Sequence, residues 1–246
     1  MQPRLYVDQV LSAGERIALP PGAARHVQVL RLQPGAALSL FNGRGGEWDA
    51  TVLRIGRSEV EVALGQHLAV ERELPWRVTL ALGMPANERM DTVIEKATEL
   101  GVAAVQPLLC ERSVLRLAGE RAQKKVEHWR GVAIAASEQS GRTRVPEIGR
   151  VMPLAQWLAD QAQPPAGTAR RILLSLRDAR PFAELMSSSP TSVVLLSGPE
   201  GGLTPAEEAA ARSAGFIAAS LGPRVLRADT APLAVLAALA LAPAGP

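Results

Sequence analysis

The amino-acid sequence predicts an α/β protein of two domains, a small β-rich domain at residues 1–72 and an α/β domain at residues 73–246. The first seventy or so residues carry short apolar runs separated by turn residues, and no convincing long helix interrupts them. After Trp76, strands alternate with amphipathic helices, which is typical of a mainly parallel sheet covered on both faces. The charged, proline-containing segment VERELPW at residues 70–76 predicts a linker between the two patterns.

In the N-terminal part, residues 36–55 read as a strand, an Asn-Gly-Arg-Gly-Gly turn and a second strand. Residues 58–64, SEVEVAL, alternate apolar and polar side chains with the period of two that a half-exposed strand requires. A domain of this size with these strands is predicted to be a small β-barrel.

In the C-terminal part, we expect each strand to be followed by a helix. The helix ERMDTVIEKATELG places its apolar residues on one face and ends at Gly101. The other expected elements are the strands 77–83, 102–109, 170–176, 192–198 and 216–222, a long helix from about 118 to 139, and helices beginning at Pro205 and near Thr230.

The basic composition bears on whether the protein binds nucleic acid. The 246 residues have a formal charge of +3 and a pI of about 9.6, and only three of the 27 basic residues are lysines. Arginine suits contact with nucleic acid, although an arginine-rich composition also follows from a GC-rich genome, so this signal is left open.

Targeting and metal signals are absent from the sequence pattern. A single cysteine, Cys110, excludes an intramolecular disulfide framework and a cysteine-based zinc site, and the three histidines lack ligand spacing. The apolar tail is too short to span a bilayer and predicts a buried helix. We therefore expect a cytoplasmic, metal-free protein that does not contact a membrane.

The segment GPEGG at residues 198–202 forms the first corner that predicts chemistry. It joins a strand to a helix whose start is fixed by Thr204-Pro205-Ala206-Glu207, a capping box with proline at the first helical position. Its spacing is neither a dinucleotide fingerprint nor a P-loop, and no lysine follows. The glycines let a ligand approach the backbone, while Glu200 indicates a ligand that is neutral or positive nearby.

A second corner follows at Gly222-Pro223, with Arg224 and Arg227 beside it. If the two corners end neighbouring parallel strands, they form one cleft at the sheet edge where ligands of α/β proteins bind. The alternative is two ordinary Gly-Pro turns with a solvated glutamate.

Five segments in the same order resemble one known family. LLSGPEGGLTPAEE and SLGPRVLRADTAPLAVLAAL are similar to the C-terminal signature of SPOUT methyltransferases, and within it to the RsmE family, which methylates N3 of a uridine in 16S ribosomal RNA of the small ribosomal subunit. The other matching segments are RHVQVLRLQPG, EKATELGVAAVQPLLCERSV and AIAASEQSGRTRVPEI.

The resemblance implies a PUA-like RNA-binding barrel at 1–72 and a SPOUT domain at 73–246 with a C-terminal trefoil knot, which forms a homodimer through the knot domain. It also implies S-adenosyl-L-methionine (AdoMet) as the cofactor, a sulfonium without phosphate that suits a glycine turn holding a carboxylate. The implied cofactor-binding residues are Leu196, Gly198, Pro199, Glu200, Gly201, Leu221, Gly222, Arg224, Leu226, Arg227 and Thr230.

Uridine N3 must lose its proton, so the reaction needs a proton acceptor and a group that stabilises negative charge. Arg227 or Arg224 is expected to stabilise the anion, and Asp229 or Glu200 to accept the proton. The alternative for Arg227 is a structural ion pair with Asp229, which replaces a glutamate common in relatives.

Basic residues in three places are implied RNA contacts. They are Arg4, Arg25, His26 and Arg31 in the barrel, Arg142 and Arg144 in the loop after the long helix, and Arg89, which is near Ala86-Asn87 where relatives often have Lys-Gly. Solvation of the barrel arginines, or capping of helix carbonyls by the loop, is the simpler alternative.

The sequence leaves three alternative functions to consider. A SPOUT enzyme acting on another RNA, such as transfer RNA, would share the fold and cofactor. A non-catalytic RNA-binding or ribosome-assembly factor would have no need of an AdoMet cleft. A nicotinamide oxidoreductase is disfavoured by the missing GxGxxG motif.

Overall fold

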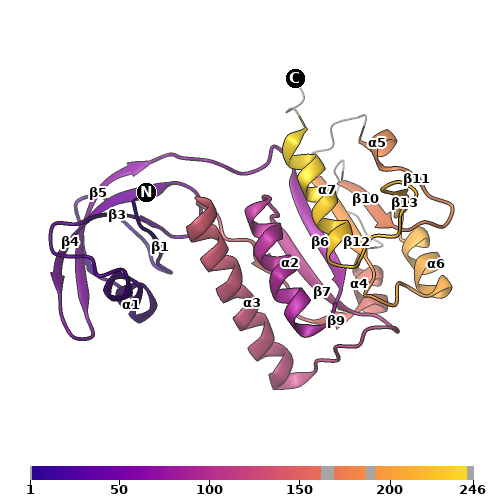
Figure 1. Cartoon of the computed structure of the whole chain (residues 1–246), viewed down its shortest axis with the longest axis horizontal. Coiled ribbons are helices and arrows are strands. Elements are labelled where there is room, and N and C mark those ends of the chain that lie inside the picture. Colours follow the sequence, from indigo (N-terminus) through magenta and orange to yellow (C-terminus); the bar gives the residue numbers. More distant parts are fainter. Residues whose placement is uncertain (1, 162–168, 187–191, 243–246) are drawn as a thin grey trace. The chain divides into compact units, whose positions relative to one another are not determined.

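The computed structural model describes residues 2–161, 169–186 and 192–242. The chain folds into two compact units (Figure 1). Unit 1 consists of Met1–Glu73 and Ile134–Val145, and unit 2 of Leu74–Ala133 and Pro146–Pro246. Unit 1 thus recruits a segment from the middle of the chain, the end of the long helix and the loop after it.

Unit 1 is β-rich, as predicted. Its five-stranded sheet has the order β1-β3-β4-β5-β2, with β1 parallel to β3 and the remaining pairs antiparallel. We did not predict α1, a nine-residue helix with proline in its first turn. The elements are β1 (Arg4–Tyr6), β2 (Arg16–Ala18), α1 (Pro21–Val29), β3 (Ala37–Phe41), β4 (Glu47–Ile55) and β5 (Val60–Leu68).

The core of unit 1 lies between this sheet and α1. Apolar side chains of alternate strand positions, such as Leu38 and Leu40 of β3, are completely buried there, and Ala24 and Val27 of α1 pack against them. The period of two along the strands therefore does what the sequence pattern predicted, because it sends one set of side chains into this core.

Unit 2 contains an eight-stranded sheet in which every pair is parallel. The order is β11-β13-β10-β12-β6-β7-β8, and β9 also pairs with β7. The strands are β6 (Arg77–Gly83), β7 (Ala104–Leu109), β8 (Glu147–Ile148), β9 (Met152–Pro153), β10 (Ala169–Leu174), β11 (Arg180–Pro181), β12 (Ser192–Ser197) and β13 (Ile217–Ser220).

Helices cover both faces of this sheet, which confirms the α/β prediction. α2 packs against α7 and α7 against β12, while α4 packs against α6 (Figure 1). A buried cluster that includes Trp157 of α4 and Phe216 fills the space under α4 and α6. The helices are α2 (Asn87–Glu99), α3 (Gly119–Ser140), α4 (Leu154–Gln161), α5 (Phe182–Leu185), α6 (Pro205–Ser213) and α7 (Thr230–Leu241).

The strand order corrects one expectation from the sequence. The strands before the two glycine corners, β12 and β13, are not neighbours, because β10 lies between them and pairs with both. Parallel neighbours end at the same edge, so the loops after β10, β12 and β13 meet there. A third loop, after β10, thus joins the two that the sequence singled out.

Candidate active site

A pocket of about 630 Å³ lies in unit 2 at the carboxyl ends of β10, β12 and β13. This volume is within the range of sites for small molecules and cofactors. Its lining comes from the three loops and one residue near the end of each of the three strands, with one residue each from α2, the loop after β7, α6 and α7. The lining residues are Arg89, Arg112, Leu174–Arg177, Ser197–Leu203, Glu208, Ala219, Leu221, Arg224–Ala228 and Ala231.

The GPEGG loop is held at both ends. Thr204 Oγ1 accepts a hydrogen bond from the Glu207 N–H (3.2 Å), and the Glu207 carboxylate accepts one from the Thr204 N–H (2.8 Å), which confirms the predicted capping box. Glu207 also accepts a hydrogen bond from the Glu111 N–H at 2.8 Å and so ties the loop after β7 to this helix start.

Two glycines are required for the shape of this loop. Gly202 has φ +68°, a conformation that side chains other than glycine rarely adopt. Gly83, at the end of β6, lies against Pro199, and a Cβ at position 83 would stand 2.5 Å from Pro199 Cδ and 2.8 Å from Cys110 Sγ. The loop can therefore rest directly on the β6 backbone.

Glu200 finds its positive partner within the protein. Its Oε1 accepts hydrogen bonds from the Ala86 N–H (3.0 Å) and from Arg89 Nη1 (3.3 Å) at the start of α2. The negative charge that the sequence placed in the glycine turn is therefore balanced before any ligand binds. Oε2 of Glu200 has no partner among the described residues, and Glu200 lines the pocket.

The pocket is rich in arginine. Arg112 Nη1 donates a hydrogen bond to the Gly201 carbonyl at 3.0 Å and so supports the glycine loop. By contrast, the guanidinium groups of Arg177, Arg224 and Arg227 have no ion pair or hydrogen bond within residues 2–161, 169–186 and 192–242. These three cations are available to a ligand or substrate.

Eight of the predicted site residues line the pocket: Gly198, Pro199, Glu200, Gly201, Leu221, Arg224, Leu226 and Arg227. Arg89, predicted as an RNA contact, joins them. Leu196, Gly222 and Thr230 do not line it; the Leu196 side chain is completely buried inside β12.

Asp229 is also outside the lining. It occupies the N-cap of α7, where its Oδ1 accepts a hydrogen bond from the Thr230 hydroxyl at 3.2 Å. Arg227 and Asp229 form no ion pair in the described part of the chain, and the role of Arg227 stays a prediction. The carboxylates that do line the pocket are Glu200 and Glu208.

Sequence reasoning missed the loop after β10 and its partners. The Ser175 hydroxyl lies 3.3 Å from both carboxylate oxygens of Glu208, and Arg212 holds the Arg177 carbonyl at 2.6 Å. The sequence Leu-Arg-Asp at the carboxyl end of a predicted strand could have indicated this part of the site. It becomes informative only when that strand is known to lie between β12 and β13 in the sheet.

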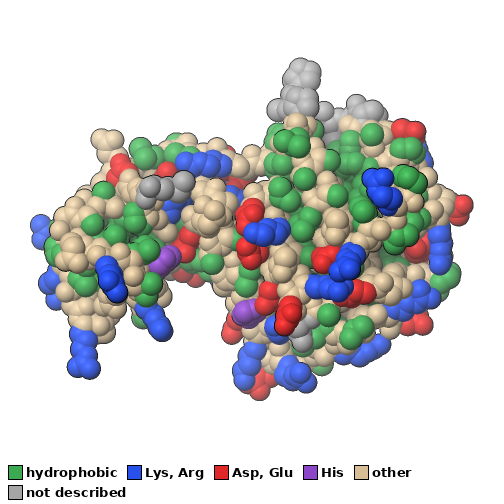
Figure 2. Space-filling model, in the orientation of Figure 1, with side chains coloured by type: hydrophobic (Ala, Val, Ile, Leu, Met, Phe, Trp, Pro, Cys, Tyr) green, Lys and Arg blue, Asp and Glu red, His purple; other side chains and the backbone are tan. Residues whose placement is uncertain are grey.

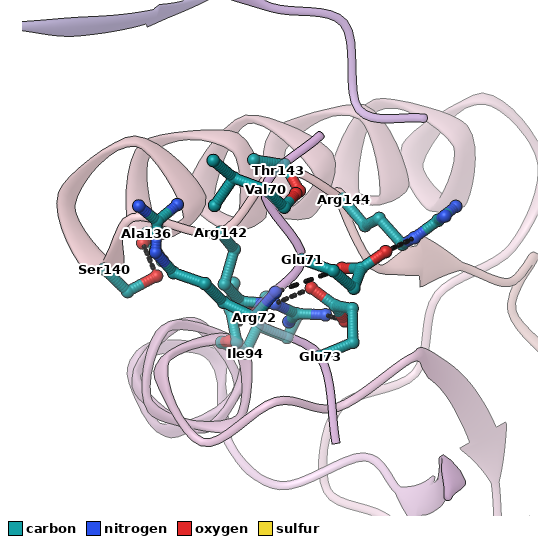
Figure 3. Close-up of polar contacts among 11 residues, drawn as sticks. Val70, Glu71, Arg72, Glu73, Ile94, Ala136, Ser140, Arg142, Thr143 and Arg144 are labelled. Carbon is teal, nitrogen blue, oxygen red and sulfur yellow. Dashed lines mark hydrogen bonds and ion pairs between the residues drawn. The ribbon is translucent and has the colours of Figure 1, made fainter. Parts of the chain in front are cut away.

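Two of the predicted RNA contacts in unit 1 are buried in ion pairs. Arg142 binds Glu73 through both ends of its guanidinium, with Nε donating at 2.9 Å, and its side chain is 4% exposed (Figure 3). Arg4 pairs with Glu47, donates to the Arg142 carbonyl at 3.0 Å and lies over the Phe41 ring. Burial also lowers the pKa of Arg4. This burial favours structural roles for Arg4 and Arg142.

The other predicted RNA contacts of unit 1 are accessible. Arg144 is half exposed beside Glu71 (Figure 3), and Arg25 and Arg31 are exposed on and after α1. His26 Nδ1 lies 3.6 Å from Glu138. Burial raises the pKa of Glu138, although its carboxylate accepts a hydrogen bond from the Tyr6 N–H at 2.8 Å.

The other features of the described residues give no second candidate for a functional site. Within the described residues, no three His, Cys, Asp or Glu side chains gather as a metal site requires. No helix in those segments has the length and apolarity to cross a membrane. The Cys110 thiol is buried, which raises its pKa to about 12. On the face of unit 2 seen in Figure 2, basic side chains lie among acidic ones.

Comparison with known families identifies the family to which this fold belongs. A family described as RNA methyltransferase domain matches residues 72–240, and one described as RNA methyltransferase PUA domain matches residues 19–64. The first match spans most of unit 2, and the second spans α1, β3, β4 and the first half of β5 in unit 1. Together they define the chain as an RNA methyltransferase.

More specifically, the chain belongs to the ribosomal RNA small subunit methyltransferase E family. It is 34% identical to the Synechocystis sp. member over 94% of this chain and 74% of that protein. Its identity to the Bacillus subtilis member is 33%, over 87% of this chain and 84% of that protein.

Solved structures of relatives have the same fold. The Neisseria gonorrhoeae ribosomal RNA small subunit methyltransferase E bound to S-adenosyl methionine superposes with a TM-score of 0.89 and 34% identity. A Legionella pneumophila protein in complex with the cofactor SAM superposes with a TM-score of 0.90 and 34% identity. In both comparisons 97% of each chain is covered.

Proposed function

We propose that this protein transfers the methyl group of AdoMet to N3 of a uridine in 16S ribosomal RNA of the small ribosomal subunit. The observation that carries the proposal is the pocket built from the GPEGG and GPRVLR loops in a chain of this family. The names of the relatives give the small-subunit RNA, and the uridine N3 target follows from the resemblance of the motifs.

The residues of the pocket fit AdoMet. The glycine loop offers the close main-chain approach that an adenosine needs, and Leu221 and Leu226 line the pocket beside it. The loop lacks a lysine, as suits a cofactor without phosphate. When bound, AdoMet supplies an electrophilic methyl group on a sulfonium. The pocket residues then contribute orientation of the reacting atoms, which provides much of the rate in such a displacement.

Side chains of the pocket would stabilise the negative charge on the uridine and accept its proton. Arg227 lines the pocket without a partner among the described residues, so its guanidinium can stabilise the anion that develops as N3 loses its proton. Among the predicted acceptors, Glu200 lines the pocket and Asp229 does not. We therefore assign the proton to Glu200 Oε2, directly or through water, while Arg89 and the Ala86 N–H hold Oε1.

Two further expectations of the resemblance belong to this proposal. The first is the trefoil knot, for which the packing of α7 against α2 and β12 and the insertion of β12 between β10 and β6 provide support. The second is a homodimer through unit 2. Ala234, Ala238 and Leu241 are exposed on the apolar helix α7, so an apolar face is available there.

The test is nucleoside mass spectrometry of unmethylated small ribosomal subunits incubated with the protein and labelled AdoMet. Bare 16S ribosomal RNA and transfer RNA serve as parallel substrates. We expect N3-methyluridine on the small-subunit RNA. Label on transfer RNA alone would refute the substrate, and absence of AdoMet binding would refute the enzymatic function in favour of a non-catalytic RNA-binding factor.

A further inference from the structure

Two large apolar side chains stand exposed at the mouth of the pocket. Val225 is 84% exposed and Leu176 is 53% exposed, and both line the pocket. Isolated exposed apolar residues are common on protein surfaces and need no explanation. The position of these two is the informative feature, because they flank the site where substrate must approach.

The two side chains come from adjacent loops. β10 and β13 are parallel neighbours, with Leu174 opposite Ala219, so the loops that follow them leave the same edge of the sheet side by side. Leu176 lies two residues after β10, and Val225 lies in the loop between β13 and α7. We call these two residues the apolar lip.

Each residue of the apolar lip has an arginine as its neighbour in sequence. Arg177 follows Leu176, and Arg224 precedes Val225. The Arg177 backbone is fixed, because its N–H donates to Ser175 Oγ at 3.0 Å and its carbonyl accepts from Arg212. Its guanidinium, like that of Arg224, contacts no acceptor in the described segments. The loop is therefore anchored while its cation remains available.

This combination matches one chemical partner, a nucleotide unit of RNA. A nucleobase offers an apolar face and its phosphate a negative charge, and a base that undergoes chemistry must leave its stack. AdoMet alone does not account for the arrangement, because it carries a single carboxylate. The pocket is lined by three cations, Arg177, Arg224 and Arg227, that have no partner in the part of the chain that the structure describes.

We infer that the apolar lip, Leu176 and Val225, holds the face of the target base over the pocket, and that Arg177 binds an adjacent phosphate. The inference rests on the proposed function and adds the substrate subsite to it. In this scheme Leu176, Val225 and Arg177 position the substrate, since none of them exchanges a proton or a methyl group.

The experiment compares Leu176→Ser and Val225→Ser with Val114→Ser. Val114 is 76% exposed in the same unit and does not line the pocket, so it controls for loss of an exposed apolar side chain. Methylation of unmethylated small ribosomal subunits is measured with saturating AdoMet, and AdoMet binding is measured by calorimetry. We expect the lip variants to raise KM for the subunits about tenfold, as for loss of one stacking contact, with AdoMet affinity unchanged.

Arg177→Ala should weaken subunit binding and reduce its salt dependence by about one phosphate contact. Leu176→Met should restore the KM, because it keeps an apolar side chain of similar size. Loss of AdoMet affinity in the lip variants would overturn the inference by placing these residues on the cofactor. A change of oligomeric state with unaltered KM would overturn it in favour of a second copy of the chain. If the unaltered protein neither binds AdoMet nor methylates subunits, the proposed function itself fails.

Discussion

The arginines of unit 1 and those around the pocket of unit 2 differ in what they bind. In unit 1, Arg4 and Arg142 are buried against glutamates and cross the unit to bind backbone or carboxylate groups. In unit 2, Arg224 and Arg227 stand at the pocket without a partner among the described residues. Arginine therefore stabilises the fold in unit 1 and is available to a ligand at the pocket of unit 2. What distinguishes the two cases is whether a carboxylate of the protein lies within reach of the guanidinium.

The largest expected effect concerns the buried pair of unit 1. Arg142→Met leaves the Glu73 carboxylate, 17% exposed, without its cation. Removing one partner of a buried ion pair costs about 3–5 kcal/mol of unfolding free energy. Urea unfolding should show this loss. Arg144→Met, which breaks the half-exposed pair with Glu71, is the matched control and should cost at most about 1 kcal/mol. Equal losses in the two variants would contradict the contrast.

On the other side of the comparison, Arg227→Ala should leave the fold intact and impair the reaction. Loss of one group that stabilises an anion in the transition state lowers kcat by about 10²–10³. Single-turnover methylation of small subunits measures it, with unfolding free energy recorded alongside. Arg121→Ala removes an exposed charge of α3 outside the pocket and should change neither quantity. A destabilised Arg227→Ala protein would place Arg227 with the structural arginines instead.

The loops of the pocket could be predicted from the sequence because their determinants are local. The capping box at Thr204 and Glu207, the glycines of GPEGG and the start of α7 at Thr230 each depend on residues a few positions apart. The α/β alternation and the β-rich first domain follow from equally local periodicities. The two corners predicted from the sequence therefore coincide with the pocket at the ends of β12 and β13.

The remaining features depend on contacts between distant parts of the chain. The order of strands in a sheet does not depend on local sequence pattern, so the position of β10 between β12 and β13 could not be predicted. For this reason Arg177 and Glu208 were not among the predicted site residues. The pairing of Glu200 with Arg89 joins residues 111 positions apart. The burial of Arg142 likewise depends on Glu73, 69 positions away, which no motif connects to it.

A smaller effect tests how closely the glycine loop rests on the sheet. Gly83→Ala would drive a Cβ into Pro199 and Cys110, and overpacking of this kind typically costs about 1–3 kcal/mol. We expect AdoMet affinity to fall about tenfold, measured by calorimetry. Gly131→Ala is the control: its Cβ would meet nothing within 4 Å in α3, so it should stabilise the helix by about 1 kcal/mol and leave affinity unchanged. Unchanged affinity in Gly83→Ala would mean that the loop shifts freely.

The smallest effect returns to unit 1 and to a carboxylate that burial opposes. Burial raises the pKa of Glu138, while the Tyr6 N–H, His26 and Arg4 all favour its ionised form and only partly offset that rise. A raised pKa in the folded state means that the stability Glu138 contributes is complete below its unfolded pKa and is lost as pH rises through its folded pKa. Glu138→Gln cannot ionise and keeps an acceptor for the Tyr6 N–H, so it escapes this loss.

The variant should therefore gain in melting temperature relative to the unaltered protein as pH rises from 4 to 7, measured by calorimetry at matched ionic strength. His26→Ala as a background separates the contribution of the histidine, whose Nδ1 lies 3.6 Å from Glu138. A gain that shrinks with rising pH would show that the attraction of Glu138 to the charges of Arg4 and His26 outweighs burial. Glu138 would then resemble Glu73 and Glu47, carboxylates that unit 1 uses to hold its arginines.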